Sequence, residues 1–120
     1  MANPFCHVEL NTTDLDKSVK FYSHLFEWKL EPLSIGADTY HLIKVGEGTG
    51  GGMMKHPVPG APSTWLAYVL VNDIKTSTTK AKQLGAAVLQ DSVEVPNMGW
   101  FSIVTDPAGA TFGMWQAKDK

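Results

Sequence analysis

The chain is 120 residues long, the size of one domain that can bury a hydrophobic core without disulfides or metals. Its formal net charge is −2 and no run of basic residues appears, so the electrostatic footprint of a nucleic-acid-binding protein is missing. No stretch approaches the ~18 consecutive apolar residues of a membrane span. The first residues also lack the charged and apolar regions of a signal peptide, and we therefore expect a cytoplasmic protein.

All 10 basic residues are lysines. Without arginine, a bound carboxylate or phosphate would be held by a lysine, a hydroxyl or backbone N–H groups instead of a guanidinium fork. This composition argues against a strongly anionic ligand. Cys6 is the single cysteine of the sequence, so no disulfide can form within the chain.

The first predicted strand, residues 5–12, alternates in polarity along its length. One side is apolar and would pack against a helix. The opposite side carries the polar side chains of His7, Glu9 and Asn11. A helix is predicted to begin after a cap at Thr13-Asp14 and to end near Trp28. Its apolar residues recur at intervals of three or four positions, which is typical of an amphipathic helix.

Three short extended segments follow, at about 29–35, 39–45 and 50–55. Turns are predicted between them at 36–38 and 46–48, where glycines interrupt the pattern. Residues 56–63 contain three prolines and a glycine and can form neither a helix nor a central strand. This segment is predicted to be a linker.

The same order of elements then repeats. A strongly apolar strand is predicted at 64–71, followed by a helix that Asn72-Asp73 caps and that ends near Leu84. Gly85 stands where a glycine commonly terminates a helix. Further extended segments are predicted at about 87–94, 100–105 and 111–117.

The two halves align at one constant offset, which pairs Asp14 with Asp73, Ser18 with Ser77 and Val45 with Val104. A repeat of this length indicates two tandem βαβββ modules, at 1–58 and 63–120, within a single domain that covers 1–120. The predicted fold class is α+β, with a curled mixed sheet that forms a cup and carries the helices on its outer face. Such a cup encloses a natural site for a small ligand.

Several short motifs resemble those of the vicinal oxygen chelate superfamily, which contains glyoxalases, bleomycin-resistance proteins and extradiol dioxygenases. The first is His7-Val-Glu-Leu-Asn-Thr-Thr-Asp14, followed by Phe21-Tyr22, Leu25-Phe26 and Trp28. The others are the glycines at 50–52 and Thr105-Asp106-Pro107-Ala108-Gly109 with Phe112-Gly113-Met114-Trp115. The resemblance spans almost the whole chain and implies the same cup of two modules, which usually pairs with a second copy as a homodimer.

The resemblance also implies where a divalent metal such as Zn²⁺, Fe²⁺ or Mn²⁺ would bind, on the first and fourth strands of each module. His7 stands at the first of these positions. The other three positions fall at Met53 or Met54, at Leu66 or Ala67, and at Gly113. Because these residues carry neither imidazole nor carboxylate, we expect no metal cofactor and interpret His7 as a vestigial ligand. A site rebuilt from His7, Glu9, His41 and His56 is an alternative without the spacing of a known motif.

His7 and Glu9 are the candidate catalytic residues, because an imidazole and a carboxylate on one strand face can transfer protons. The alternative is that these side chains and Asn11 only hydrogen-bond across strands. Trp100 and Trp115 are the first choices for aromatic side chains that line an apolar pocket. The complete predicted ligand-binding set is His7, Glu9, Asn11, Met53, Trp100, Gly113 and Trp115.

The glycine cluster at 48–52 is not a phosphate-binding loop, because it lacks the following Lys-Ser/Thr and the strand-to-helix context of such loops. We interpret it as a bulge or as a close contact between backbones.

Three functions follow from these features. The first is metal-free binding of a small, partly apolar molecule, as in bleomycin-resistance proteins, and the missing ligands favour it. The second is a metal-free enzyme in which His7 or Glu9 transfers a proton on a bound carbonyl compound. The third is a divalent-metal lyase, isomerase or dioxygenase. The expected partners are a small molecule and a second copy of the chain, with no nucleic acid and no membrane.

Overall fold

The computed structural model describes residues 2–35 and 38–118. Their internal contacts group the chain into two compact units, which we describe separately. The N-terminal unit is His7–Leu66, and the C-terminal unit joins Met1–Cys6 to Ala67–Lys120. The predicted turn at 36–38 falls largely on residues 36–37, which lie outside the described residues.

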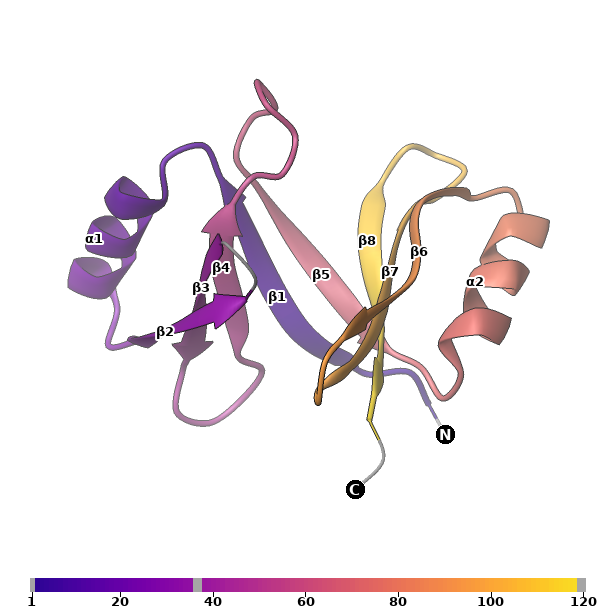
Figure 1. Ribbon diagram of the computed structural model, residues 1–120, viewed down its shortest axis with the longest axis horizontal. Coiled ribbons are helices and arrows are strands. Elements are labelled where there is room, and N and C mark those ends of the chain that lie inside the picture. Colours follow the sequence, from indigo (N-terminus) through magenta and orange to yellow (C-terminus); the bar gives the residue numbers. More distant parts are fainter. Residues whose placement is uncertain (1, 36–37, 119–120) are drawn as a thin grey trace. The chain divides into compact units, whose positions relative to one another are not determined.

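The first module contains four strands and one helix. In chain order they are β1 (Phe5–Thr12), α1 (Leu15–Leu25), β2 (Lys29–Ile35), β3 (Asp38–Lys44) and β4 (Gly51–Lys55). The strand order is β2-β3-β4-β1, in which β1 pairs with β4 in parallel and the other pairs are antiparallel. In Figure 1, α1 lies beside the strands of this module, and it packs against β2 and β4.

The second module repeats this plan. Its elements are β5 (Thr64–Leu70), α2 (Ile74–Gln83), β6 (Ala87–Val95), β7 (Gly99–Thr105) and β8 (Thr111–Ala117). The strand order is β5-β8-β7-β6, again with one parallel pair, β5 with β8. The helix α2 packs against β6, β7 and β8 (Figure 1). The predicted α+β class with two tandem βαβββ modules is therefore confirmed.

Both helices begin at the predicted aspartates. The carboxylate of Asp14 accepts a hydrogen bond from the backbone N–H of Lys17 at 3.1 Å, and Asp73 caps α2 through Thr76 at the same distance. The helix α1 ends at Leu25, earlier than expected, because Phe26 already has extended backbone angles. No helix among residues 2–35 and 38–118 is both long enough and apolar enough to span a bilayer.

Each unit has its own hydrophobic core on the helix side of its strands. In the N-terminal unit, Leu10, Ile43 and Met53 are buried together beneath α1. In the C-terminal unit, the buried core consists of Val71, Ile74, Val104 and Met114. Because side chains alternate along a strand, these cores determine which residues lie on the other face of each sheet.

Candidate functional site

The pairing of β1 with β4 shows which face of β1 carries its polar side chains. Leu10 pairs with Met53 on the core side, and Glu9 pairs with Gly52. Alternation therefore places Glu9, and with it His7 and Asn11, on the face away from α1. This is the face that the sequence predicted for these three side chains.

Tyr40 of β3 joins His7 and Glu9 on this face. Its hydroxyl lies 2.7 Å from Nε2 of His7 and donates a hydrogen bond of 3.1 Å to Oε1 of Glu9. The rings of Tyr40 and His7 are nearly parallel, with an interplanar angle of 16° and centroids 6.3 Å apart. We call these three side chains the polar triad. All three are half-buried.

Two glycines of β4 make this arrangement possible. A Cβ atom built on Gly52 would overlap the hydroxyl and ring of Tyr40. A Cβ atom on Gly51 would overlap the backbone carbonyl of Val8 in the neighbouring strand. The close backbone contact that the sequence predicted for the glycine cluster is therefore found at Gly51, and Gly52 provides the space for Tyr40.

Burial sets the charge of His7. It lowers the pKa of the imidazole below its ordinary value, because removal from water disfavours the protonated ring. His7 is therefore neutral near pH 7, in a tautomer that its hydrogen bond with Tyr40 selects. A neutral imidazole, a phenol and a carboxylate can together accept and donate hydrogen bonds to a bound polar group.

Asn11 continues the same strand face. Its side chain is only 7% exposed, and within residues 2–35 and 38–118 its Oδ1 has no hydrogen-bond partner. An unpaired buried acceptor costs about 1–3 kcal/mol. Asn11 thus adds an unpaired buried acceptor to the strand face that carries His7 and Glu9.

Met53, another predicted site residue, lies elsewhere. It is fully buried at 0% exposure in the core with Leu10 and Ile43. We expected Met53 to line the ligand site, and the structure places it on the other face of the sheet. On β4, Gly52 and Met54 share the face of Glu9, whereas Met53 points toward α1. Met53 has a structural role in the core.

The C-terminal unit contains the remaining predicted site residues. Gly113 pairs with Tyr68, whose ring fills the space that a side chain at position 113 would need. Trp115 is half-buried on the same strand, next to the core residue Met114 and therefore on the opposite face. Trp100 instead packs against the core beneath α2, and Nζ of Lys118 lies 5.2 Å from its ring. This differs from the expected pocket-lining position.

The strand pairings also show which residue of each module's fourth strand lies opposite the first strand at the expected metal position. Glu9 pairs with Gly52 in the first module, and Tyr68 pairs with Gly113 in the second. The counterpart of Gly113 is therefore Gly52, in place of the expected Met53 or Met54. Neither glycine has a side-chain donor atom, so these positions do not fit the divalent metal that the sequence resemblance implies. Within the described part of the chain, no three His, Cys, Asp or Glu side chains cluster as metal ligands, and His41 and His56 do not rebuild such a site.

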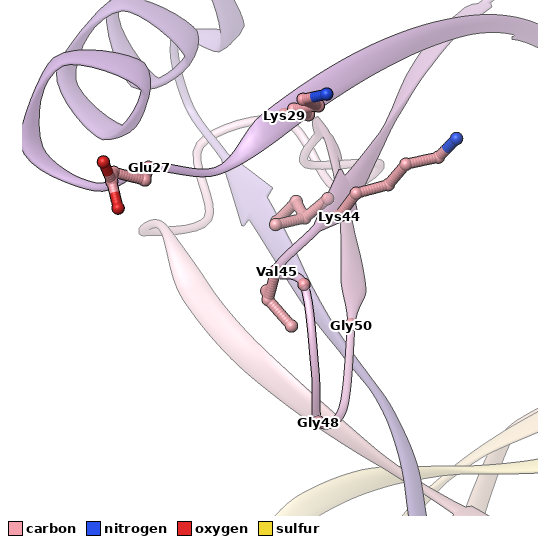
Figure 2. Close-up of a pocket in the computed structure, with 8 residues that line it drawn as sticks. Glu27, Lys29, Lys44, Val45, Gly48 and Gly50 are labelled. Carbon is pink, nitrogen blue, oxygen red and sulfur yellow. The ribbon is translucent and has the colours of Figure 1, made fainter.

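A shallow hollow of about 670 Å³ opens elsewhere on the N-terminal unit (Figure 2). It is lined by Glu27, Lys29, Ile43, Lys44, Val45, Gly46, Gly48 and Gly50. Figure 2 shows that the side chain of Lys44 extends away from Val45 and Gly48, and its ammonium group pairs with Glu31 at 2.9 Å. The hollow contains no member of the polar triad, and we place the candidate site at the triad.

Comparison with known proteins gives the class of this protein. Residues 7–114 match the model of the glyoxalase-like domain, and the chain belongs to that family. The chain is 32% identical over 107 residues to a Mycobacterium bovis protein named "Putative glyoxylase CFP32", covering 88% of this chain and 41% of the relative. It is 24% identical to the anthracycline biosynthesis protein DnrV of Streptomyces peucetius, covering 90% and 45%. The chain thus spans less than half the length of these curated relatives.

Solved structures share the fold at low sequence identity. A hypothetical protein, BH1468 of Bacillus halodurans, superposes with a TM-score of 0.76 at 13% identity, covering 100% of this chain and 98% of that one. Methylmalonyl-CoA epimerase of Mycobacterium tuberculosis gives a TM-score of 0.73 at 13% identity, with 96% and 88% covered. These likenesses support the architecture.

Tyr40 is the site residue that the sequence did not single out. It lies on β3, separated from β1 by β4, and the sequence does not reveal that strand order directly. Only an indirect sign of this contact is present in the sequence. Tyr40 lies on one predicted strand, and a run of glycines lies on the next.

Proposed function

We propose that the N-terminal unit binds a small, partly apolar molecule without a metal and holds its polar group on the polar triad. The observation that carries this proposal is the Tyr40 hydroxyl, which lies within hydrogen-bond distance of both His7 and Glu9. Three polar side chains converge on a sheet face where a bound molecule can replace the water around them.

The charges of the triad restrict the ligand. His7 is held neutral by burial and Glu9 supplies a carboxylate, so the triad favours a neutral or cationic group over an anionic one. The absence of arginine from the sequence acts in the same direction. Hydroxyl, amine and carbonyl groups are the chemical classes that such a set recognises. Relatives named for anthracycline biosynthesis and as a glyoxylase support aromatic and carbonyl compounds as the first to test.

The second candidate function is proton transfer on a bound carbonyl compound, the reaction type of a metal-free isomerase or lyase. The specific observation in its favour is the hydrogen-bonded path from His7 through Tyr40 to Glu9. General acid–base catalysis needs groups of this kind within about 2.6–3.2 Å of the proton that moves. Metal-dependent dioxygenase chemistry lacks a comparable donor set in the described residues.

A thermal-shift assay with aromatic and carbonyl compounds, including an anthracycline and methylglyoxal, tests the proposal. Binding raises the melting temperature in proportion to the logarithm of ligand concentration over Kd. The proposal predicts a stabilising compound whose effect falls in Tyr40→Phe. If no compound stabilises the protein, or if Tyr40→Phe binds equally well, the triad is not the binding site.

The replacement His7→Ala separates the two candidate functions. A binder keeps most of its affinity, because Tyr40 and Glu9 still contact the ligand. A proton-transfer enzyme loses turnover while it still binds. Exchange of the ligand's α-proton in D₂O, followed by NMR with and without His7, gives the readout.

We also propose that the chain forms a homodimer through an apolar patch on α1, the residue that follows α1, and β5. The patch consists of Phe21, Leu25, Phe26 and Trp65, which are between 40% and 58% exposed. A two-fold interface joins a surface to its own copy, and an apolar surface is complementary to itself. The curated relatives have room for a second domain of this size, since this chain covers only 41–45% of their length. A second copy of the chain is therefore the proposed occupant.

A further inference from the structure

We infer that Gly52 is a positioning residue that keeps Tyr40 between His7 and Glu9, and that the polar triad is a relay that moves a proton between His7 and Glu9. This inference rests on the proposed site. It concerns the unliganded protein, however, and can be tested without knowing the ligand.

Tyr40 is on β3 and His7 is on β1, so the tyrosine side chain must cross β4 to reach its partners. It crosses at Gly52, where even the Cβ atom of alanine would occupy the place of the Tyr40 hydroxyl. The backbone of Gly52 is outside the left-handed region, and the position therefore needs glycine for space and not for conformation.

The proton count then assigns donors and acceptors. A tyrosine hydroxyl has one proton, and an ionised carboxylate can only accept. Since Tyr40 donates to Glu9, the 2.7 Å contact with His7 must be donated by Nε2–H of the imidazole. In the alternative arrangement Glu9 is protonated and donates to Tyr40, Tyr40 donates to Nε2 of His7, and the neutral imidazole carries its proton on Nδ1. The second arrangement therefore holds one proton more than the first, and its net charge changes from −1 to 0.

This difference of one proton defines the transfer step. When Nδ1 of His7 takes a proton from a bound molecule, the Nε2 proton passes to the oxygen of Tyr40, and the hydroxyl proton of Tyr40 passes to Oε1 of Glu9. His7 and Tyr40 end neutral, Glu9 becomes a neutral carboxylic acid, and the bound molecule has lost one proton. The reverse sequence returns the proton, and no electron transfer is involved.

The test is NMR of protein with ¹⁵N-labelled histidine, supported by thermal unfolding. In the natural sequence we expect His7 as the Nε2–H tautomer, with a slowly exchanging Nε2–H proton signal. We expect this signal to be lost in Tyr40→Phe, which keeps the ring but lacks the hydroxyl. We also expect its loss in Gly52→Ala, which must displace the tyrosine.

A double variant controls for a general folding defect. Gly52→Ala should lower the melting temperature in the natural background. In a Tyr40→Ala background, where the clashing side chain is gone, the same change at Gly52 should have almost no effect. A Gly52→Ala protein that keeps the His7 signal would overturn the inference, and so would equal destabilisation by Gly52→Ala in the two backgrounds. An Nδ1–H tautomer of His7 in the natural protein would also overturn it.

The outcomes also separate this inference from the proposed function. If the His7 signal behaves as expected but no compound binds, the relay stands and the ligand proposal fails. If a compound binds through Tyr40 but His7 has the other tautomer, the binding site stands and the relay fails.

Discussion

The hydroxyl of Tyr40 lies 2.7 Å from Nε2 of His7, although the strands that carry these residues are separated by β4. The contact crosses β4 at Gly52, and it places a phenol beside the histidine that the sequence resemblance suggested as a vestigial metal ligand. The polar network of this protein is therefore built from side chains of β1 and β3 that meet across β4.

Removal of the Tyr40 hydroxyl should destabilise the protein. Tyr40→Phe leaves His7 and Glu9 without a partner that they share, and we expect the free energy of unfolding to fall by about 1–3 kcal/mol. Chemical denaturation measures this change. Tyr22→Phe is the matched control, because Tyr22 is a half-buried tyrosine outside the triad whose ring packs against Trp28, and its replacement should cost much less. Equal losses in both variants would show that the triad contributes nothing specific.

The stability of the protein should depend on the protonation of His7. Its pKa is lowered by burial, so the unfolded chain binds this proton more readily than the folded chain does. The contribution of His7 to the free energy of unfolding is therefore fully present above its unfolded pKa of about 6.5. It is lost as the pH falls through the lower pKa of the folded protein. Melting temperatures measured from pH 8 to pH 5 should fall less steeply in His7→Gln. An identical pH dependence in both proteins would contradict this assignment.

Met53 should behave as a core residue. Met53→Ala should lower the free energy of unfolding by about 2–5 kcal/mol, because the side chain is completely buried. Met53→Leu conserves most of the volume and should cost less than about 1.5 kcal/mol. Ligand affinity, once a compound is found, should be unchanged in Met53→Leu. A large loss of affinity in a stable Met53→Leu protein would return Met53 to the binding site.

The homodimer should depend on the exposed patch of α1. Phe21→Lys places a charge at a position that is 58% exposed, so the monomer should tolerate it while dimer affinity falls. Leu84→Lys is the matched control, since Leu84 is 69% exposed in the C-terminal unit, outside the patch. Sedimentation velocity over a concentration series measures both. A natural protein that stays monomeric, or a dimer that Phe21→Lys leaves intact, would contradict the proposal.

The sequence predicted the architecture because the signals for it are local. Asp14 and Asp73 are helix caps that need only the residues beside them, and the spacing of apolar residues on α1 is visible in the chain. The polar face of β1 was also predicted, since His7 and Glu9 alternate with clearly apolar neighbours.

The rest of the site could not be predicted for two physical reasons. The first is that neighbouring residues on a strand can both be apolar. Met53 and Met54 are such a pair, as are Trp100 and Phe101, so the alternation of side chains does not show which of each pair faces the core. The second is strand order, since Tyr40 meets His7 only after β3, β4 and β1 have paired. Non-local pairing therefore decided the composition of the polar triad.

The metal content of the purified protein tests the central claim most directly, namely that the polar triad works without a metal. Elemental analysis of protein prepared without chelators should find no stoichiometric divalent metal, and EDTA should leave the melting temperature unchanged. About one zinc, iron, manganese, cobalt or nickel ion per chain, lost in His7→Ala, would contradict the account, because His7 would then be a metal ligand and not a member of a hydrogen-bonded triad.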